Sequence, residues 1–141
     1  MMKMTNLILI MSLFTATLNA PPSSVVSIPI AEAVRPYDAL WRATCRVESK
    51  CNPLAIGDKH LERHSYGIVQ IRKVRLDDYF KRTGIRYGVL DMFDVEKSKE
   101  VFMYYCAGTD LEYISRAWNG GYGGTEKQAT LEYWKLIQTK L

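Results

Sequence analysis

The chain has few cysteines, few histidines and no block of like charge. Its 141 residues include three Cys and two His, and 19 Lys and Arg residues are interspersed with 15 Asp and Glu. A formal net charge of +4 without a basic cluster gives no indication of nucleic acid binding. Internal repeats and low-complexity tracts are absent as well. The composition is that of an ordinary globular domain.

No apolar run in the N-terminal region is long enough to span a bilayer, which needs about 20 residues. The run from Leu7 to Phe14 is preceded by Lys3 and followed by small and polar residues that end at Ala20. This order of charge, apolar core and small residues is typical of a secretory signal peptide. We therefore predict that residues 1–20 are a signal peptide, that the protein is exported to the periplasm or outside the cell, and that it has no stable membrane span.

The three cysteines, Cys45, Cys51 and Cys106, would allow one disulfide in an oxidising compartment and leave one thiol. Cys45 and Cys51 could each pair with Cys106, and the sequence does not decide between them.

The rest of the chain suits a single domain, since domains commonly contain about 100 to 150 residues. Residues 21–36 are rich in Pro, Ser and Val without a helical period and are predicted to form an extended tether. Residues 37–141 are predicted to form the folded domain.

Helical periodicity dominates this domain. Leu40, Ala43 and Val47 recur at helical spacing, which predicts a helix from Ala39 to Lys50 with Asp38 as the N-cap. Further helices are predicted at Val74–Lys81, at Asp94–Cys106, after the capping-box pattern Thr109–Glu112 and after the pattern Thr125–Gln128. Glycines indicate that residues 118–124 are not regular helix. We predict a mainly α fold with a small β-like patch near residues 55–71.

Glu48 is the strongest candidate for a catalytic residue. It lies in the last turn of a predicted helix, on the same face as Trp41, and both the helix dipole and an apolar neighbour would raise the pKa of its carboxyl. A carboxylic acid that stays protonated can deliver a proton to a glycosidic oxygen. The residues therefore suggest glycan cleavage, although a lone Glu is more often a solvated surface residue.

Four motifs in order resemble the soluble lytic transglycosylase family of lysozyme-like proteins. They are Glu48-Ser49-x-x-Asn52-Pro53-x-Ala55, Ser65-x-Gly67-Ile68-x-Gln70, Ala117-Trp118-Asn119-Gly120-Gly121 and Thr130-x-x-Tyr133-x-Lys135. The resemblance spans residues 39–137 and implies a mainly α, lysozyme-like α+β fold. It departs from the family pattern at Cys51, at Trp118 and in a longer charged segment from Gly57 to His64.

The resemblance implies that peptidoglycan strands are the substrate and that Glu48 acts first as acid and then as base. The product would be a 1,6-anhydro-muramic sugar, because the muramic 6-hydroxyl replaces water as the nucleophile. By the same resemblance, the substrate-binding residues would be Ser49, Ser65, Gln70, Asn119 and Tyr133. Glycines 67, 120 and 121 would let the backbone approach the ligand closely. No cofactor and no metal are implied, and protein partners are not indicated.

Alternatives stay open at this point. Asp58 or Glu62 could act as a second carboxylate, which would make the protein a hydrolase resembling goose-type lysozyme. The pattern His60-x-Glu62-x-His64 has the spacing of two metal ligands, but a solvated loop explains it better. Cys51 with a histidine would suit a wall peptidase, and a wall-binding module without activity would keep the same fold.

Overall fold

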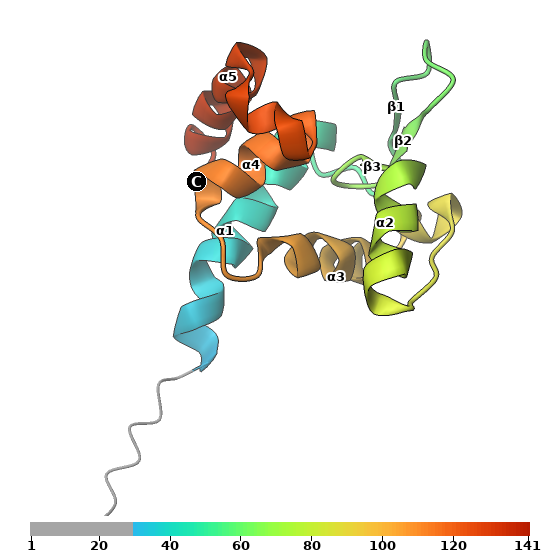
Figure 1. Cartoon of the computed structure of the whole chain (residues 1–141), viewed down its shortest axis with the longest axis horizontal. Coiled ribbons are helices and arrows are strands. Elements are labelled where there is room, and N and C mark those ends of the chain that lie inside the picture. Colours follow the sequence, from blue (N-terminus) through green and yellow to red (C-terminus); the bar gives the residue numbers. More distant parts are fainter. Residues whose placement is uncertain (1–29) are drawn as a thin grey trace, which may run out of the picture.

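The computed structural model describes the backbone of residues 30–141 and the side chains of residues 37–141. Figure 1 shows two groups of elements joined by helix α3: helices α1, α4 and α5 lie on one side, and the strands with α2 lie on the other. The elements are α1 (Ile30–Ser49), β1 (Ile56–Gly57), β2 (Ser65–Tyr66), β3 (Ile71–Arg72), α2 (Lys73–Thr83), η1 (Val89–Phe93), α3 (Val95–Cys106), α4 (Leu111–Gly120), η2 (Tyr122–Glu126) and α5 (Gln128–Gln138). None of the helices in this part of the chain is both long and apolar enough to cross a membrane.

Helix α1 begins at Ile30, nine residues earlier than predicted. Residues 30–36 of the predicted tether are therefore helical, which agrees with the good helix formers Ala31 and Ala33 in this stretch. Asp38 lies inside the helix rather than at its N-cap, and its carboxylate pairs with Lys99 of α3 at 2.9 Å. The predicted signal peptide and residues 21–29 lie outside the described residues.

The predicted β-like patch is confirmed as a three-stranded antiparallel sheet in the order β1-β2-β3. Ile56 faces Tyr66 across the first pair of strands, and Tyr66 faces Ile71 across the second. The segment from Ser65 to Ile71 is not one extended strand, because a turn separates β2 from β3. Gly67 in this turn has a φ of 78°, a left-handed conformation that glycine adopts without a steric penalty.

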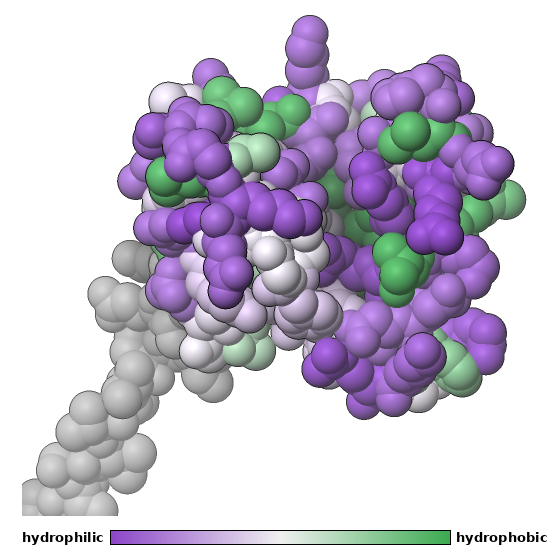
Figure 2. All heavy atoms as spheres, turned by 45° about the horizontal axis from the view of Figure 1, so that its top comes forward, coloured by the Kyte–Doolittle hydropathy of each residue, from purple (hydrophilic) through white to green (hydrophobic). Residues whose placement is uncertain are grey.

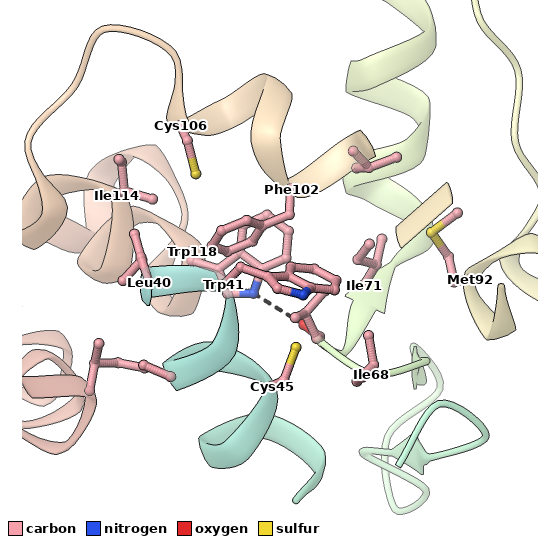
Figure 3. Close-up of a cluster of buried hydrophobic side chains, with 14 of the residues drawn as sticks. Leu40, Trp41, Cys45, Ile68, Ile71, Met92, Phe102, Cys106, Ile114 and Trp118 are labelled. Atoms are coloured by element: carbon pink, nitrogen blue, oxygen red, sulfur yellow. Dashed lines mark hydrogen bonds between the residues drawn. The ribbon is translucent and has the colours of Figure 1, made fainter. Parts of the chain in front are cut away.

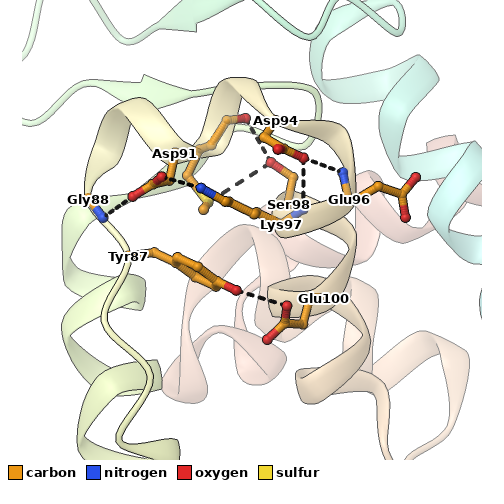
Figure 4. A network of polar contacts seen from close by, with 9 residues as sticks. Tyr87, Gly88, Asp91, Asp94, Glu96, Lys97, Ser98 and Glu100 are labelled. Atoms are coloured by element: carbon orange, nitrogen blue, oxygen red, sulfur yellow. Dashed lines mark hydrogen bonds and ion pairs between the residues drawn. The ribbon is translucent and has the colours of Figure 1, made fainter.

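The helix boundaries on either side of residue 90 follow the sequence closely. Helix α2 ends at Gly84, which is left-handed and donates its N–H to the Phe80 carbonyl at 2.8 Å. Helix α3 begins after Asp94, whose carboxylate accepts hydrogen bonds from the N–H groups of Glu96 and Lys97 (Figure 4). The same figure shows the Lys97 ammonium reaching Asp91 of η1, a contact of 2.6 Å.

The last two helices begin differently from the prediction. Asp110, not Thr109, caps α4 by accepting the Tyr113 N–H at 2.8 Å. Helix α4 also runs through Trp118 to Gly120, because the chain turns only at Gly121, where φ is 74°. No capping box forms at Thr125: this residue lies in η2, and α5 starts without a side-chain cap.

The core is built around a cluster of aromatic rings from three helices (Figure 3). Phe102 packs edge to face against Trp41, with centroids 5.4 Å apart, and against Trp118 at 4.8 Å. All three cysteines are free thiols, so no disulfide to Cys106 is formed. Cys45 and Cys106 are both buried, and the view of Figure 3 draws them on opposite sides of the aromatic rings.

Candidate functional site

A cleft of about 950 Å³ runs between the two groups of elements. Figure 2 shows this hollow between the part of the molecule that contains α4 and α5 and the part that contains α2 and the strands. Glu48 lies in the cleft, at the end of α1. The other lining residues are Gly57, Asp58, Ser65, Gln70, Arg72, Val74, Arg75, Asp77, Asp78, Lys81, Tyr105, Tyr113, Ile114, Ala117, Trp118, Asn119, Gly120, Gly121 and Tyr122.

The carboxyl of Glu48 is partly buried and has one hydrogen-bond donor. The hydroxyl of Tyr133, on α5, donates to its Oε1 at 2.6 Å. Burial raises the pKa of Glu48 above its ordinary value, and the charge of Asp58 raises it further, whereas the bond from Tyr133 offsets part of this shift. Trp41, the aromatic predicted to shield Glu48, packs against Phe102 in the core. The hydrogen bond to the acid comes instead from an aromatic residue 85 positions later in the chain.

The end of α1 is fixed by backbone geometry just beyond Glu48. Lys50 and Cys51 both have positive φ, 55° and 62°, and the Cys51 N–H donates to the Cys45 carbonyl at 2.9 Å. The hydroxyl of Ser49 donates to the Ile68 carbonyl at 2.7 Å, which ties the helix end to the turn between β2 and β3. Because these bonds flank Glu48, its backbone position is set by both α1 and the sheet.

Ser65 and Gln70 form one hydrogen-bonded unit on the sheet side of the cleft. The Ser65 hydroxyl donates to Gln70 Oε1 at 2.7 Å, and Gln70 Nε2 donates to the Gly67 carbonyl at 2.8 Å. A Cβ on Gly57 would lie 2.0 Å from Gln70 Oε1, so the absence of a side chain there makes room for the amide. Gln70 is thus hydrogen-bonded to residues of its own turn. The predicted contact between Gln70 and a ligand stays a prediction.

Asn119 lines the opposite wall, near the end of α4, and its side chain is exposed. Ser49 and Tyr133 do not line the cleft directly. Ser49 bonds to the turn between β2 and β3, and Tyr133 bonds to Glu48. The structure therefore brings Glu48, Ser65, Gln70 and Asn119 to one cleft, with Tyr133 behind the acid.

Two glycines of the motifs are required by packing inside the protein. A Cβ on Gly67 would lie 1.9 Å from the Met92 carbonyl oxygen, and one on Gly120 would lie 2.5 Å from Thr130 Cγ2. Gly121 has open space around it but a φ of 74°. Packing therefore explains the glycines at 67 and 120, and the expectation that Gly67, Gly120 and Gly121 let the backbone approach a ligand stays a prediction.

The two candidates for a second carboxylate are placed differently. Asp58 lines the cleft, and its Oδ2 accepts two bonds from Arg72, at 2.7 Å from Nη2 and 3.2 Å from Nε. The hydrogen bonds from Arg72 lower the pKa of Asp58. Glu62 is exposed on the β1–β2 connection and does not line the cleft. Among the carboxyl groups of the cleft, Glu48 and Asp58 thus have pKa values that are shifted in opposite directions.

The sequence did not predict the hydrogen-bonded group around Asp78 on the α2 side of the cleft. The carboxylate of Asp78 accepts hydrogen bonds from Tyr105 at 2.8 Å, Tyr122 at 3.2 Å and Arg82 at 2.8 Å. Arg75, one turn earlier on α2, lines the cleft as well. The buried residues Leu76 and Tyr79 mark the inner face of α2, but they do not reveal which neighbours turn toward the cleft.

In chemical terms, the site offers one shielded acid in an elongated polar cleft. A carboxyl group with a raised pKa can donate a proton near neutral pH. The groups available to bind a polar polymer are the hydroxyls, amide and cations along the walls. Within residues 37–141 no cluster of three or more His, Cys, Asp and Glu side chains is arranged to hold a metal ion.

The architecture is shared with a known enzyme. The crystal structure of the lysozyme of Tapes japonica matches this chain with a TM-score of 0.56 and 24% sequence identity, over 71% of this chain and 86% of the lysozyme. No protein-family model matches the chain, and no curated protein sequence matches it either. At this identity the likeness concerns the fold. The chain therefore has a lysozyme-like fold, mainly helical with a small antiparallel sheet.

Proposed function

We propose that this protein is an exported enzyme of the soluble lytic transglycosylase type, which cleaves the β-1,4 bond between N-acetylmuramic acid and N-acetylglucosamine in peptidoglycan. The observation that carries the proposal is Glu48: its carboxyl lies in a large cleft, is shielded from water and has a raised pKa. The lysozyme-like fold and the four motifs around this cleft support the same assignment.

The proposed reaction uses Glu48 twice. Its carboxyl first gives a proton to the glycosidic oxygen, and the bond from that oxygen to the muramic anomeric carbon breaks. The muramic 6-hydroxyl then bonds to the anomeric carbon and returns its proton to Glu48. The products are a free 4-hydroxyl on one fragment and a 1,6-anhydro ring on the other, so water is not consumed and a second catalytic carboxylate is not needed.

The other residues are proposed to bind and position the strand. Asn119 has an exposed amide on one wall, and the Ser65–Gln70 unit forms part of the other. Ser49 is proposed to hold the end of α1 in place through its bond to Ile68. Tyr133, which lies behind the acid, is proposed to orient the Glu48 carboxyl.

The proposal is tested by digestion of purified peptidoglycan followed by mass spectrometry of the soluble fragments. A transglycosylase releases fragments that are one water lighter than the products of hydrolysis. Hydrated fragments with reducing ends would assign hydrolysis instead. Cleaved stem peptides with intact glycan strands would contradict glycan cleavage and favour a wall peptidase, and binding without any cleavage would indicate a wall-binding module.

A second candidate function is hydrolysis with Asp58 as the second carboxylate. Its support is that Asp58 lines the same cleft and is held with a lowered pKa opposite an acid with a raised pKa. Its carboxylate is, however, already bound by Arg72 through two hydrogen bonds.

Replacement of Asp58 by Asn separates the two reactions. We expect Asp58→Asn to keep its rate of glycan cleavage within about threefold, because the transglycosylase route needs no second carboxylate, whereas a hydrolase would lose about 100-fold or more. The exposed Glu62, replaced by Gln, is the matched control. Initial rates on the same peptidoglycan preparation, compared with the wild type, give the answer.

Replacement of Tyr133 by Phe should change the pH profile of cleavage. The hydrogen bond from Tyr133 lowers the pKa of Glu48, so its removal should raise that pKa further. A general acid must be protonated, and activity is therefore lost as the pH rises through its pKa. We expect the alkaline limb of the kcat/KM profile to move to higher pH in Tyr133→Phe. An unchanged limb would show that Glu48 does not govern it.

A further inference from the structure

Within residues 37–141, Arg75 is a cation of the cleft that forms no ion pair. Its Nη2 donates to the main-chain carbonyls of Ala117 at 3.3 Å and Trp118 at 3.2 Å. The centre of its guanidinium lies 4.1 Å from the ring centroid of Trp118 and 5.0 Å from that of Tyr105. Burial lowers its pKa, but an arginine remains charged at physiological pH. The cleft wall thus carries a fixed positive charge that is partly withdrawn from water.

The aspartates that line the cleft are paired with other cations. Asp58 pairs with Arg72 at 2.7 Å. Asp77 pairs with Lys73 at 2.7 Å, and Asp78 pairs with Arg82 at 2.8 Å. Glu48 is the remaining carboxyl of the cleft, and its raised pKa favours the uncharged form.

Two lining cations stay without an ion pair within residues 37–141: Arg75 and, two turns along α2, Lys81. In the same part of the chain, Nη1 and Nε of Arg75 form no hydrogen bond. A guanidinium has five N–H donors in a planar fork that matches a carboxylate, so donors remain for a ligand. The unmatched charge on the cleft wall is therefore positive.

We propose that Arg75, assisted by Lys81, forms an anion subsite that recognises a carboxylate group on the glycan substrate. This inference rests on the proposed function, because it gives the chemical character of the strand that the cleft prefers. Two sources of the carboxylate share this chemistry: the lactyl group of a muramic acid that carries no peptide, and an acidic residue of the stem peptide. A neutral polymer of N-acetylglucosamine has neither.

The contacts of Arg75 also hold α2 against the last turn of α4, and this bracing role predicts a different result. Loss of bracing would weaken the binding of every glycan, because the cleft itself would change shape. Loss of an anion subsite would weaken only the binding of ligands that carry a carboxylate. A comparison of charged and neutral ligands therefore separates the two roles.

The test measures binding to the full chain in the Glu48→Gln background, which prevents turnover. The three ligands are a neutral chitin oligomer, glycan strands stripped of peptide, and strands with intact stem peptides. We expect Arg75→Gln to weaken binding of at least one carboxylate-bearing ligand by about 10- to 100-fold, and to leave the chitin oligomer within about twofold. Arg75→Lys, which keeps the charge, should lose less. Arg86→Gln is the matched control, since Arg86 lies outside the cleft lining and covers the ring of Phe80.

The pattern across ligands identifies the source of the carboxylate. A loss with stripped strands assigns the lactyl group, and a loss confined to peptide-bearing strands assigns the stem peptide. Equal losses with all three ligands, or none with the charged ones, would overturn the anion subsite. If the protein with Glu48 intact does not cleave the charged strands that are bound in this test, the proposed function alone is wrong. If none of the three ligands is bound, the proposed function and the anion subsite are both wrong.

Discussion

Glu48→Gln should lower the rate of glycan cleavage by about 10²- to 10⁴-fold, the usual contribution of a general acid or base. The amide has the size of the carboxyl but cannot give its proton to the glycosidic oxygen. The Tyr133 hydroxyl, which donates to Glu48 at 2.6 Å, can donate to the amide oxygen in the same way. Release of soluble fragments from peptidoglycan over a time course measures the loss. Glu62→Gln, an exposed Glu outside the cleft, is the control and should keep full activity.

The same variant should not lose stability. The pKa of Glu48 is higher in the folded protein than in the unfolded chain, because burial disfavours its ionised form. The stability associated with the neutral carboxyl is therefore present below the unfolded pKa and is lost as the pH rises through the folded pKa. Gln does not ionise, so the Tm of Glu48→Gln at alkaline pH should equal or exceed that of the wild type. If Glu48→Gln stayed active, Glu48 would not be the catalyst. If it were inactive but unfolded, the loss of activity would give no support for Glu48 as the catalyst.

Gly67→Ala should be the most damaging single-atom addition in the sheet region. The new Cβ would lie 1.9 Å from the Met92 carbonyl oxygen and 2.8 Å from its carbon, and the backbone φ of 78° is unfavourable for alanine. Backbone strain and overpacking each cost about 1 to 3 kcal/mol, so we expect a loss of about 3 kcal/mol or more in the free energy of unfolding. Urea denaturation, followed by circular dichroism, measures it.

Gly84→Ala is the matched control for this prediction. Gly84 has nearly the same φ, 76°, but a Cβ there would meet nothing within 4 Å. This variant bears only the penalty of the left-handed conformation, about 1 to 2 kcal/mol. If both variants lost the same free energy, the contact between Gly67 and Met92 would not matter, and the close packing of the sheet against η1 would have to be reconsidered.

Much of the fold could be predicted because its helix boundaries are encoded locally. Asp94 caps α3 with its own side chain, and Gly84 ends α2 in a left-handed turn, so these boundaries need only neighbouring residues. The predicted start of α5 was wrong because this boundary depends on distant residues. Thr130 donates to the Gly124 carbonyl at 2.6 Å and a Cβ on Gly120 would collide with it, so packing between α4 and α5 decides the path of the intervening loop.

The site shows the same division between local and distant information. Glu48 could be selected from its place at a helix end and from the motifs around it. The donor to its carboxyl, Tyr133, is 85 positions away, and only the resemblance to a known family included it in the predicted site. Arg75 could not be selected at all, because its position depends on contacts with α4 that begin at Ala117.

The floor of the cleft connects its two walls. The indole N–H of Trp118, on α4, donates to the Val69 carbonyl on the sheet side at 3.1 Å, and the same helix end accepts two bonds from Arg75 of α2. A hinge motion that opened or narrowed the groove would have to break these three bonds together. The width of the groove should thus be the same before and after a polymer binds. The selection of strands should therefore rest on the shape and charge that the groove already has in the free protein.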